Sequence, residues 1–126
     1  MQETIEKLSL DKIKRHIFLC ADQTKPKCCD RDLGIACWEY LKNRLHELGL
    51  DHPSKLDANC VFRTKANCLR VCINGPILLV YPDGVWYRQA TPKVIEQILQ
   101  QHILRGQILD EYAFHVHPLD NNVKFH

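Results

Sequence analysis

The sequence has no run of apolar residues that approaches the length needed to span a bilayer. Its first ten residues, MQETIEKLSL, contain neither the basic segment nor the long apolar stretch of a signal peptide. A membrane protein and an exported protein are therefore not expected, and the cytosol is the expected location.

Internal repeats, low-complexity tracts and a large excess of one charge are also missing. The chain has 17 lysines and arginines against 15 acidic residues, which gives a formal net charge of +2 at pH 7. That balance is not the strongly basic one of nucleic-acid-binding proteins, so no nucleic-acid partner is expected. With 126 residues, of which 45% are hydrophobic, the chain is most simply one domain that buries its own core.

Cysteine is what the sequence has in quantity. Seven cysteines is an odd number for a disulfide framework, and in a reducing compartment clustered cysteines more often bind a metal or perform redox chemistry. Cys68 and Cys72 stand four residues apart in the stretch CLRVCINGP, and a helical turn would point both sulfurs to one side. A metal centre needs more than two such ligands, so we expect the others from Cys20 and from the adjacent pair Cys28 and Cys29.

The apolar pattern predicts alternating strands and helices. In chain order, the predicted elements are a strand over 16–20, a cysteine loop over 21–32, a helix over 33–48, a strand over 60–66, a second cysteine loop over 67–76, a hairpin over 77–89 and a helix over 92–105. Residues 1–14 are expected to form a short helix or a tail, and the stretch ILDEYAFHVHPL an extended segment at the sheet edge. This order predicts an α/β sandwich of the thioredoxin-like type, in which a mixed sheet is flanked by helices.

Turn and cap residues support these boundaries. Pro82-Asp83-Gly84 has the composition of a hairpin turn, and Thr91 before Pro92 is a favoured helix start. Asp32 is the predicted N-cap of the first long helix, and Gly49 is its predicted C-cap. These residues set where the hairpin begins to turn and where the helices are expected to start or stop.

The segments HIFLC, CLRVCINGP and ILLVYPDGVWY, with the helix that begins at the following TP, resemble the thioredoxin-like 2Fe–2S ferredoxins, most closely the cyanobacterial-type ferredoxin-domain proteins. The resemblance implies a thioredoxin-like 2Fe–2S ferredoxin domain over 15–108, an N-terminal extension over 1–14 and a C-terminal extension over 109–126. It also implies one 2Fe–2S cluster as the cofactor, often a homodimer, and one-electron transfer to redox partner proteins such as a reductase or an acceptor enzyme. Thioredoxin-like folds commonly have a cis proline before the central hairpin, so the Gly75–Pro76 bond is predicted to be cis.

The resemblance further implies which cysteines bind the cluster. The family pattern has one cysteine at the end of the first strand, a second after a loop, and then a pair separated by three residues. By position this pattern carries over to Cys20, Cys29, Cys68 and Cys72. Counting back from the helix favours Cys29 over Cys28, but the loop is shorter here than in many relatives and lacks their glycine-rich stretch, so Cys28 stays open as the second ligand.

Other kinds of cysteine chemistry compete with the cluster. Four thiolates suit zinc equally well, but zinc sites usually take their ligands from two close pairs, and only Cys68 and Cys72 form such a pair. A thiol oxidoreductase needs a Cys-x-x-Cys at the end of the first strand, where this sequence reads CADQ. A redox sensor built on the cluster is the remaining alternative. Cys37 and Cys60 are expected to pack as small hydrophobic residues, with a ligand-exchange or redox role also open for Cys60.

Two further groups have both a surface and a functional interpretation. Arg63, Lys65 and Arg70 lie in a stretch without acidic residues. They form either a solvated strand face or a basic collar that counters the anionic cluster, raises its potential and attracts an acidic partner. His115 and His117 alternate along the chain, so they would share one face of a strand, where surface or edge histidines are the first interpretation and metal binding is the alternative.

Overall fold

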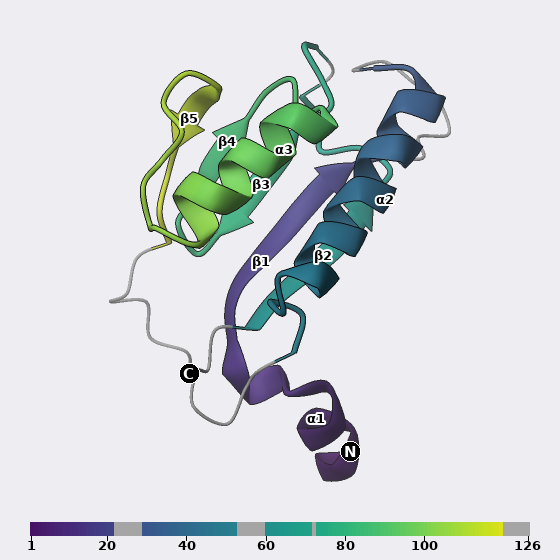
Figure 1. Cartoon of the computed structure of the whole chain (residues 1–126), viewed down its shortest axis with the longest axis vertical. Helices are drawn as coiled ribbons and strands as arrows, with labels where there is room; N and C mark the ends of the chain where they lie inside the picture. Colours follow the sequence, from purple (N-terminus) through teal and green to yellow (C-terminus); the bar gives the residue numbers. More distant parts are fainter. Residues whose placement is uncertain (22–28, 53–59, 72, 120–126) are drawn as a thin grey trace.

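The computed structural model describes residues 1–21, 29–52, 60–71 and 73–119 (Figure 1). Its elements, in chain order, are α1 (Gln2–Leu8), η1 (Leu10–Lys12), β1 (Ile13–Cys20), α2 (Arg31–Glu47), β2 (Cys60–Ala66), β3 (Leu78–Tyr81), β4 (Val85–Tyr87), α3 (Pro92–Ile98), the π-helical turn η2 (Leu99–Ile103) and β5 (Ala113–Val116). The strands pair in the order β2-β1-β3-β4-β5, with β1 and β2 parallel and the other neighbouring pairs antiparallel. The predicted mixed sheet is confirmed.

Helices α2 and α3 lie side by side over one face of the sheet (Figure 1). Side chains alternate between the two faces of a strand, and those that face the helices form the core with the inner sides of α2 and α3. The main contributors to this core are Ile17, Leu19, Cys37, Leu41, Leu45, Leu78, Val80, Val85, Tyr87, Val94, Ile95 and Ile98. Cys37 and Cys60 are both fully buried, which confirms their predicted packing as small hydrophobic residues.

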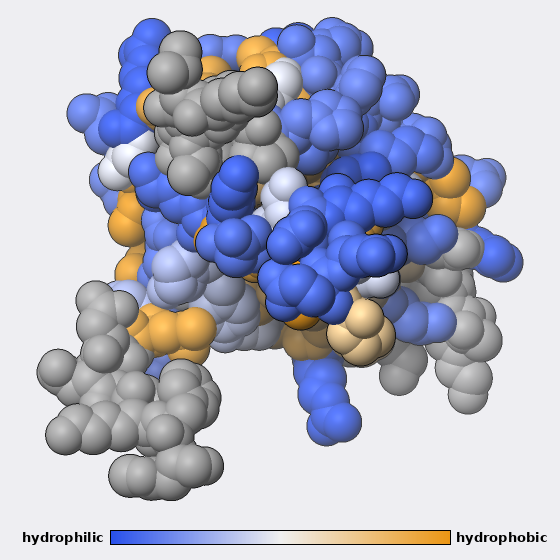
Figure 2. All heavy atoms as spheres, turned by 90° about the horizontal axis from the view of Figure 1, so that it is seen from below, coloured by the Kyte–Doolittle hydropathy of each residue, from blue (hydrophilic) through white to orange (hydrophobic). Residues whose placement is uncertain are grey.

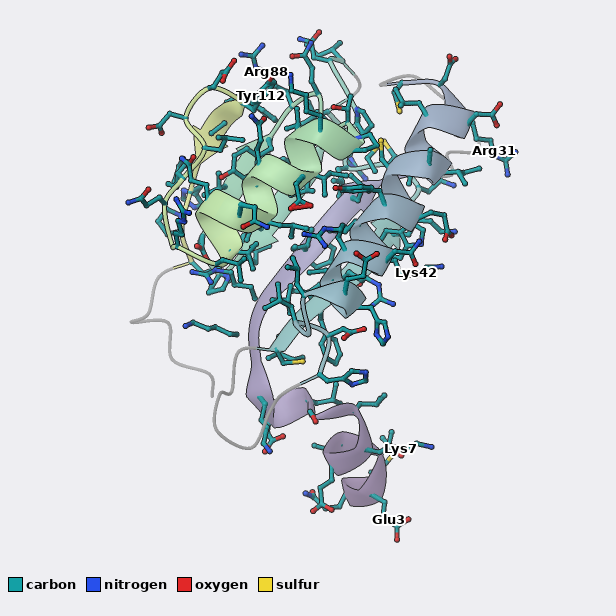
Figure 3. All side chains as sticks on the ribbon, in the orientation of Figure 1. Glu3, Lys7, Arg31, Lys42, Arg88 and Tyr112 are labelled. Atoms are coloured by element: carbon teal, nitrogen blue, oxygen red, sulfur yellow. The ribbon has the colours of Figure 1, made fainter. Side chains whose placement is uncertain are left out.

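The outer surface is mostly polar. Seen from below, hydrophilic side chains cover most of the visible face, and hydrophobic ones form small separate patches (Figure 2). On the outer side of α2, Arg31 and Lys42 point away from the sheet (Figure 3). In the described part of the chain, no helix is long and apolar enough to cross a membrane.

A charged clamp joins α2 to α3 at the rim of the core. The Arg44 guanidinium donates to both carboxylate oxygens of Glu96, at 2.6 and 3.0 Å, and the Tyr40 hydroxyl donates to the same carboxylate at 2.9 Å. Paired charge-assisted hydrogen bonds of this kind fix both distance and orientation. The Arg44 guanidinium lowers the pKa of Glu96 to about 2, so the clamp persists well into the acid range.

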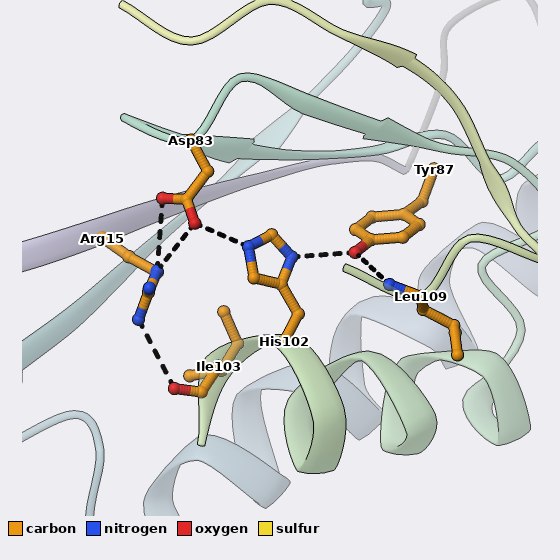
Figure 4. Close-up of polar contacts among 6 residues, drawn as sticks. All are labelled: Arg15, Asp83, Tyr87, His102, Ile103 and Leu109. Atoms are coloured by element: carbon orange, nitrogen blue, oxygen red, sulfur yellow. Dashed lines mark hydrogen bonds and ion pairs between the residues drawn. The ribbon is translucent and has the colours of Figure 1, made fainter. Parts of the chain in front are cut away.

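A buried polar network ties the β3–β4 hairpin to η2 (Figure 4). The Leu109 N–H donates to the Tyr87 hydroxyl at 3.1 Å, and that hydroxyl shares a hydrogen bond with His102 Nδ1 at 2.8 Å. His102 Nε2 lies 2.7 Å from an Asp83 oxygen, and Arg15 Nε lies 3.2 Å from both oxygens of Asp83. Burial alone would raise the pKa of Asp83, but the hydrogen bond with His102 and the charge of Arg15 outweigh it, and the pKa is lowered.

Most predicted boundaries agree with the structure, but β1 begins at Ile13, three residues before the predicted start, and one cap is wrong. Strand β2 has the predicted bounds, and the Thr91 hydroxyl accepts the N–H three residues later, at 3.5 Å, as expected of the N-cap of α3. The N-cap of α2 is Asp30 and not Asp32, because the helix already begins at Arg31. Asp32 lies in the first turn instead, where a negative charge complements the helix dipole.

The chain ends also follow the predicted pattern in outline. Helix α1 is the short N-terminal helix, and β5 is the expected extended segment, paired with β4 at the sheet edge.

At the end of α2 the C-cap is Leu48, and Gly49, the predicted cap, follows it with φ of +70°, a conformation that favours glycine. In the hairpin turn Gly84 has φ of +69°, and a Cβ there would collide with the backbone carbonyl of His117.

Candidate metal centre

Three parts of the chain meet at the upper edge of the sheet in Figure 1. Strand β1 ends there at Cys20, and its parallel neighbour β2 ends at Ala66, the register partner of Cys20. Because the carboxyl ends of parallel strands lie at the same edge, the chain after Ala66 brings Cys68 to the region of Cys20. On the other side of β1, the Cys20 N–H donates to the carbonyl of Ile77, just before β3, at 3.0 Å. The segments 67–71 and 73–77 therefore flank the end of β1.

Backbone hydrogen bonds attach the second of these segments to the chain after β4. The Gln89 N–H donates to the Asn74 carbonyl at 2.7 Å, and the Ala90 N–H donates to the Pro76 carbonyl at 2.9 Å. The Gly75–Pro76 bond is cis, which confirms the prediction made from the sequence. The backbone beside the cysteine pair is thus held by the body of the domain.

Cys20 and Cys29 pack against one small apolar cluster. Cys20 is 1% exposed and lies against Ile77, which is fully buried. The residues packed around these two are Cys29, Leu69, Val71 and Trp86. Water has little access to this side of the site, so charges and hydrogen bonds near the Cys20 sulfur act more strongly than they would in water.

Cys68 lies on the exposed side of the same region. Its Sγ accepts a hydrogen bond from the Arg70 N–H at 3.2 Å. Arg70 has φ of +69°, a left-handed conformation that is uncommon for a residue with a side chain. Hydrogen bonds to cysteine sulfurs are one of the means by which proteins tune iron–sulfur sites.

The structure thus brings Cys20 and Cys29 to one cluster and places Cys68 on the adjoining segment. Cys28 and Cys72 lie outside the described residues. The fourth ligand and the preference for Cys29 over Cys28 therefore stay predictions.

Cys37 and Cys60 lie away from this centre. Cys37 is inside the core between α2 and the sheet, and burial raises the pKa of its thiol to about 11. Cys60 opens β2, so at a rise of about 3.3 Å per residue it lies roughly 20 Å from the edge where that strand ends. Neither residue belongs to the cluster around Cys20 and Ile77.

Positive groups lie near the centre, together with the acidic Asp30 and Asp32 at the start of α2. Helix α2 begins at Arg31, two residues after Cys29, so the positive end of its dipole lies next to the site. Arg31, Lys65 and Arg70 are exposed in this part of the molecule. Arg63 differs from the other predicted collar residues, because its guanidinium lies 5.9 Å from the ring centre of Trp38 on α2. The basic collar therefore lacks Arg63, and it includes Arg31 in addition to the predicted Lys65 and Arg70.

Trp86 is the residue of the site that the cysteine spacing does not reveal. It points to the face of the sheet opposite Val85 and Tyr87, which are fully buried under the helices, and it packs in the Cys20 cluster. Its ring centre lies 6.3 Å from that of Phe114 on β5. The alternation within VWY is the signal that could have found it, since successive strand residues face opposite sides.

The donor set limits the chemistry of this centre. Cysteine thiolates select soft or borderline metals, which include iron–sulfur cores and zinc. A centre with four thiolates carries net negative charge, and the Arg70 N–H, the positive end of α2 and the exposed cations all favour such charge. The residues present therefore fit an iron–sulfur cluster.

No protein-family model matches the chain. Comparison with known proteins finds relatives that are similar in sequence and solved structures that are similar in fold. The chain is 41% identical over 98 residues to a 2Fe–2S ferredoxin from Aquifex aeolicus (strain VF5), a match that covers 74% of this chain and 82% of that protein. It is 30% identical over 97 residues to a 2Fe–2S ferredoxin from Clostridium pasteurianum, covering 76% of this chain and 91% of that protein. A solved structure of a thioredoxin-like 2Fe–2S ferredoxin from A. aeolicus has a TM-score of 0.66 at 22% identity, covering 81% of this chain and 91% of that chain. This likeness confirms the predicted thioredoxin-like fold.

Proposed function

The chain belongs to the thioredoxin-like 2Fe–2S ferredoxin family, and on this premise we propose that Cys20, Cys29, Cys68 and Cys72 hold one 2Fe–2S cluster and that the protein carries single electrons. One observation carries the proposal. Cys20 and Cys29 pack in one cluster at the end of β1, and the segment that contains Cys68 follows the end of the neighbouring strand β2. In this proposal the ferredoxin domain is the unit over 15–108, and the C-terminal extension adds the edge strand β5 to its sheet.

The bound cluster would supply the one-electron chemistry, and the chain sets its surroundings. Ile77 and Trp86 keep water from the buried Cys20. The Arg70 N–H stabilises negative charge on the Cys68 sulfur. Reduction adds one more negative charge, so this hydrogen bond and the positive end of α2 favour the reduced state and raise the reduction potential.

The exposed side of the site is the side from which we expect electrons to enter and leave. Cys68 is exposed there, and so is Ile73, with 67% of its surface accessible. Arg31, Lys65 and Arg70 give this region positive charge, which suits an acidic redox partner such as a reductase or an acceptor enzyme. In this proposal the protein is a cytosolic electron carrier and not an enzyme.

A second copy of the chain is the other proposed partner, as the resemblance implies. The sheet face opposite the helices carries Phe18, Phe62 and Tyr81, which contact neighbouring rings and leave part of their surface accessible. Sedimentation equilibrium of the protein tests this point, and a monomer at high concentration would contradict it.

The function is tested by reducing the anaerobically purified protein and following its visible absorption and its EPR signal. An electron carrier is expected to show a signal on reduction and to exchange electrons rapidly with a low-potential reductase. A reducible cluster without such exchange would indicate a redox sensor. A colourless protein with thiol–disulfide exchange activity would contradict the proposal altogether.

A further inference from the structure

The end of α2 that lies away from the cysteine centre carries a second set of metal-binding side chains. The Gly49 N–H donates to the His46 carbonyl at 3.0 Å, and the Leu50 N–H donates to the Leu45 carbonyl at 2.9 Å, so the chain folds back on the last turn of the helix. The Val61 N–H donates to the Leu50 carbonyl at 2.9 Å, which fixes the turn to β2. Asp51 follows directly and faces His46.

Three donor atoms converge at this turn. His46 Nδ1 lies 3.0 Å from Asp51 Oδ2, and His52 Nε2 lies 3.8 Å from Asp51 Oδ1. One ligand atom from each of the three residues lies within 4.8 Å of the others. Two ligands of a tetrahedral zinc ion, each about 2.1 Å from the metal, stand about 3.4 Å apart. The two separations, which involve different oxygens of Asp51, lie below and above this value.

Asp51 also has an unsatisfied oxygen at this position. Its side chain is 14% exposed, and within the described residues its Oδ1 is buried without a hydrogen-bond donor. A buried acceptor without a partner costs free energy, which a cation at this point would offset. The imidazoles of His46 and His52 are 69% and 76% exposed, so they leave room for water as a further ligand.

We propose that His46, Asp51 and His52 bind one divalent transition-metal ion, with Zn²⁺ as the preferred one. Two imidazoles and a carboxylate suit zinc, whereas Mg²⁺ and Ca²⁺ prefer oxygen ligands. The 17 residues of α2 span about 25 Å at 1.5 Å per residue, and the cysteine centre lies at the other end of this helix. The two sites therefore share no ligand, and zinc would bind without displacing the cysteine-bound cofactor.

The test is a calorimetric titration of the purified protein with Zn²⁺. His115 and His117, whose rings stack with centroids 6.3 Å apart, form another exposed histidine pair, so the titration uses a His115→Ala, His117→Ala background. In that background we expect one added Zn²⁺ per chain and no binding of Mg²⁺ at the same concentration. Loss even of groups that only support a metal ligand costs about 10–100-fold in affinity, so His52→Ala is expected to weaken zinc binding at least tenfold.

Matched variants distinguish a metal site from a general charge effect. Asp51→Asn and His46→Ala are expected to weaken binding as His52→Ala does, whereas Asp110→Asn, which removes an exposed acid elsewhere, leaves it unchanged. His52→Ala removes an exposed ring, so it should keep the unfolding temperature without zinc and lose the rise that zinc causes. No zinc uptake by the background protein, equal uptake by the variants, or uptake only with loss of visible absorption would overturn the proposal.

Discussion

Replacing Tyr87 by Phe removes a single oxygen from the buried network of Figure 4. Tyr87 and His102 are 0% and 1% exposed, so no water replaces that oxygen without rearrangement. The change leaves the Leu109 N–H without its acceptor at 3.1 Å and His102 Nδ1 without its partner at 2.8 Å. Each unsatisfied buried group costs about 1–3 kcal/mol, so we expect the two groups left unpaired by Tyr87→Phe to lower the free energy of unfolding by roughly 2–6 kcal/mol.

The assay is the shift of the urea unfolding midpoint, measured together with hydrogen exchange of the Leu109 amide. Tyr112→Phe is the matched control, because Tyr112 is half-buried and its hydroxyl has no hydrogen bond within the described residues. We expect this control to stay within about 0.5 kcal/mol of the parent protein. If Tyr87→Phe were as stable as Tyr112→Phe and the Leu109 amide exchanged no faster, the network would not hold the hairpin as argued.

Three further substitutions test other parts of the structure. Cys29→Ser should shift or abolish the visible absorption while Cys28→Ser leaves it unchanged, and the opposite pattern in absorption spectra would make Cys28 the ligand. Glu96→Gln should lower the free energy of unfolding most above about pH 4.5, because the pKa of Glu96 is lowered in the folded state. The difference from the parent protein should vanish as the pH falls toward about 2, and a difference that persists below pH 2 in acid titrations would contradict this. Gly84→Ala should unfold at lower urea than Gly106→Ala, since both glycines have positive φ but only at Gly84 does an added Cβ meet backbone, and equal midpoints would refute the clash.

Local signals in the sequence predicted much of this fold. Strand β2 ends at the predicted residues, Thr91 caps α3, and the Gly75–Pro76 bond is cis. The strand bounds and the helix cap depend on a few neighbouring residues whose chemistry leaves little choice, whereas the cis bond is predicted from the thioredoxin-like fold that the sequence resembles. The N-cap of α2 is different, because Asp30 and Asp32 both suit a helix start and the choice depends on how the preceding loop enters the helix.

Features built from distant residues could not be predicted in the same way. Arg15 and Asp83 are 68 positions apart, and only the sheet register and the packing of η2 bring them to His102. The approach of Cys20 to Cys29 and the cluster around Ile77 likewise depend on strand order, which a sequence pattern does not contain. Spacing and resemblance name four candidate cysteines, but the packing of Trp86 beside Cys20 and the Arg70 amide on the Cys68 sulfur come from the structure.

The most direct test of the central claim is the iron, acid-labile sulfide and zinc content of the protein purified without oxygen. The account predicts two irons and two sulfides per chain in a brown protein, because the four predicted thiolates hold one 2Fe–2S cluster. Stoichiometric zinc at the cysteines, with neither iron nor sulfide, would contradict it.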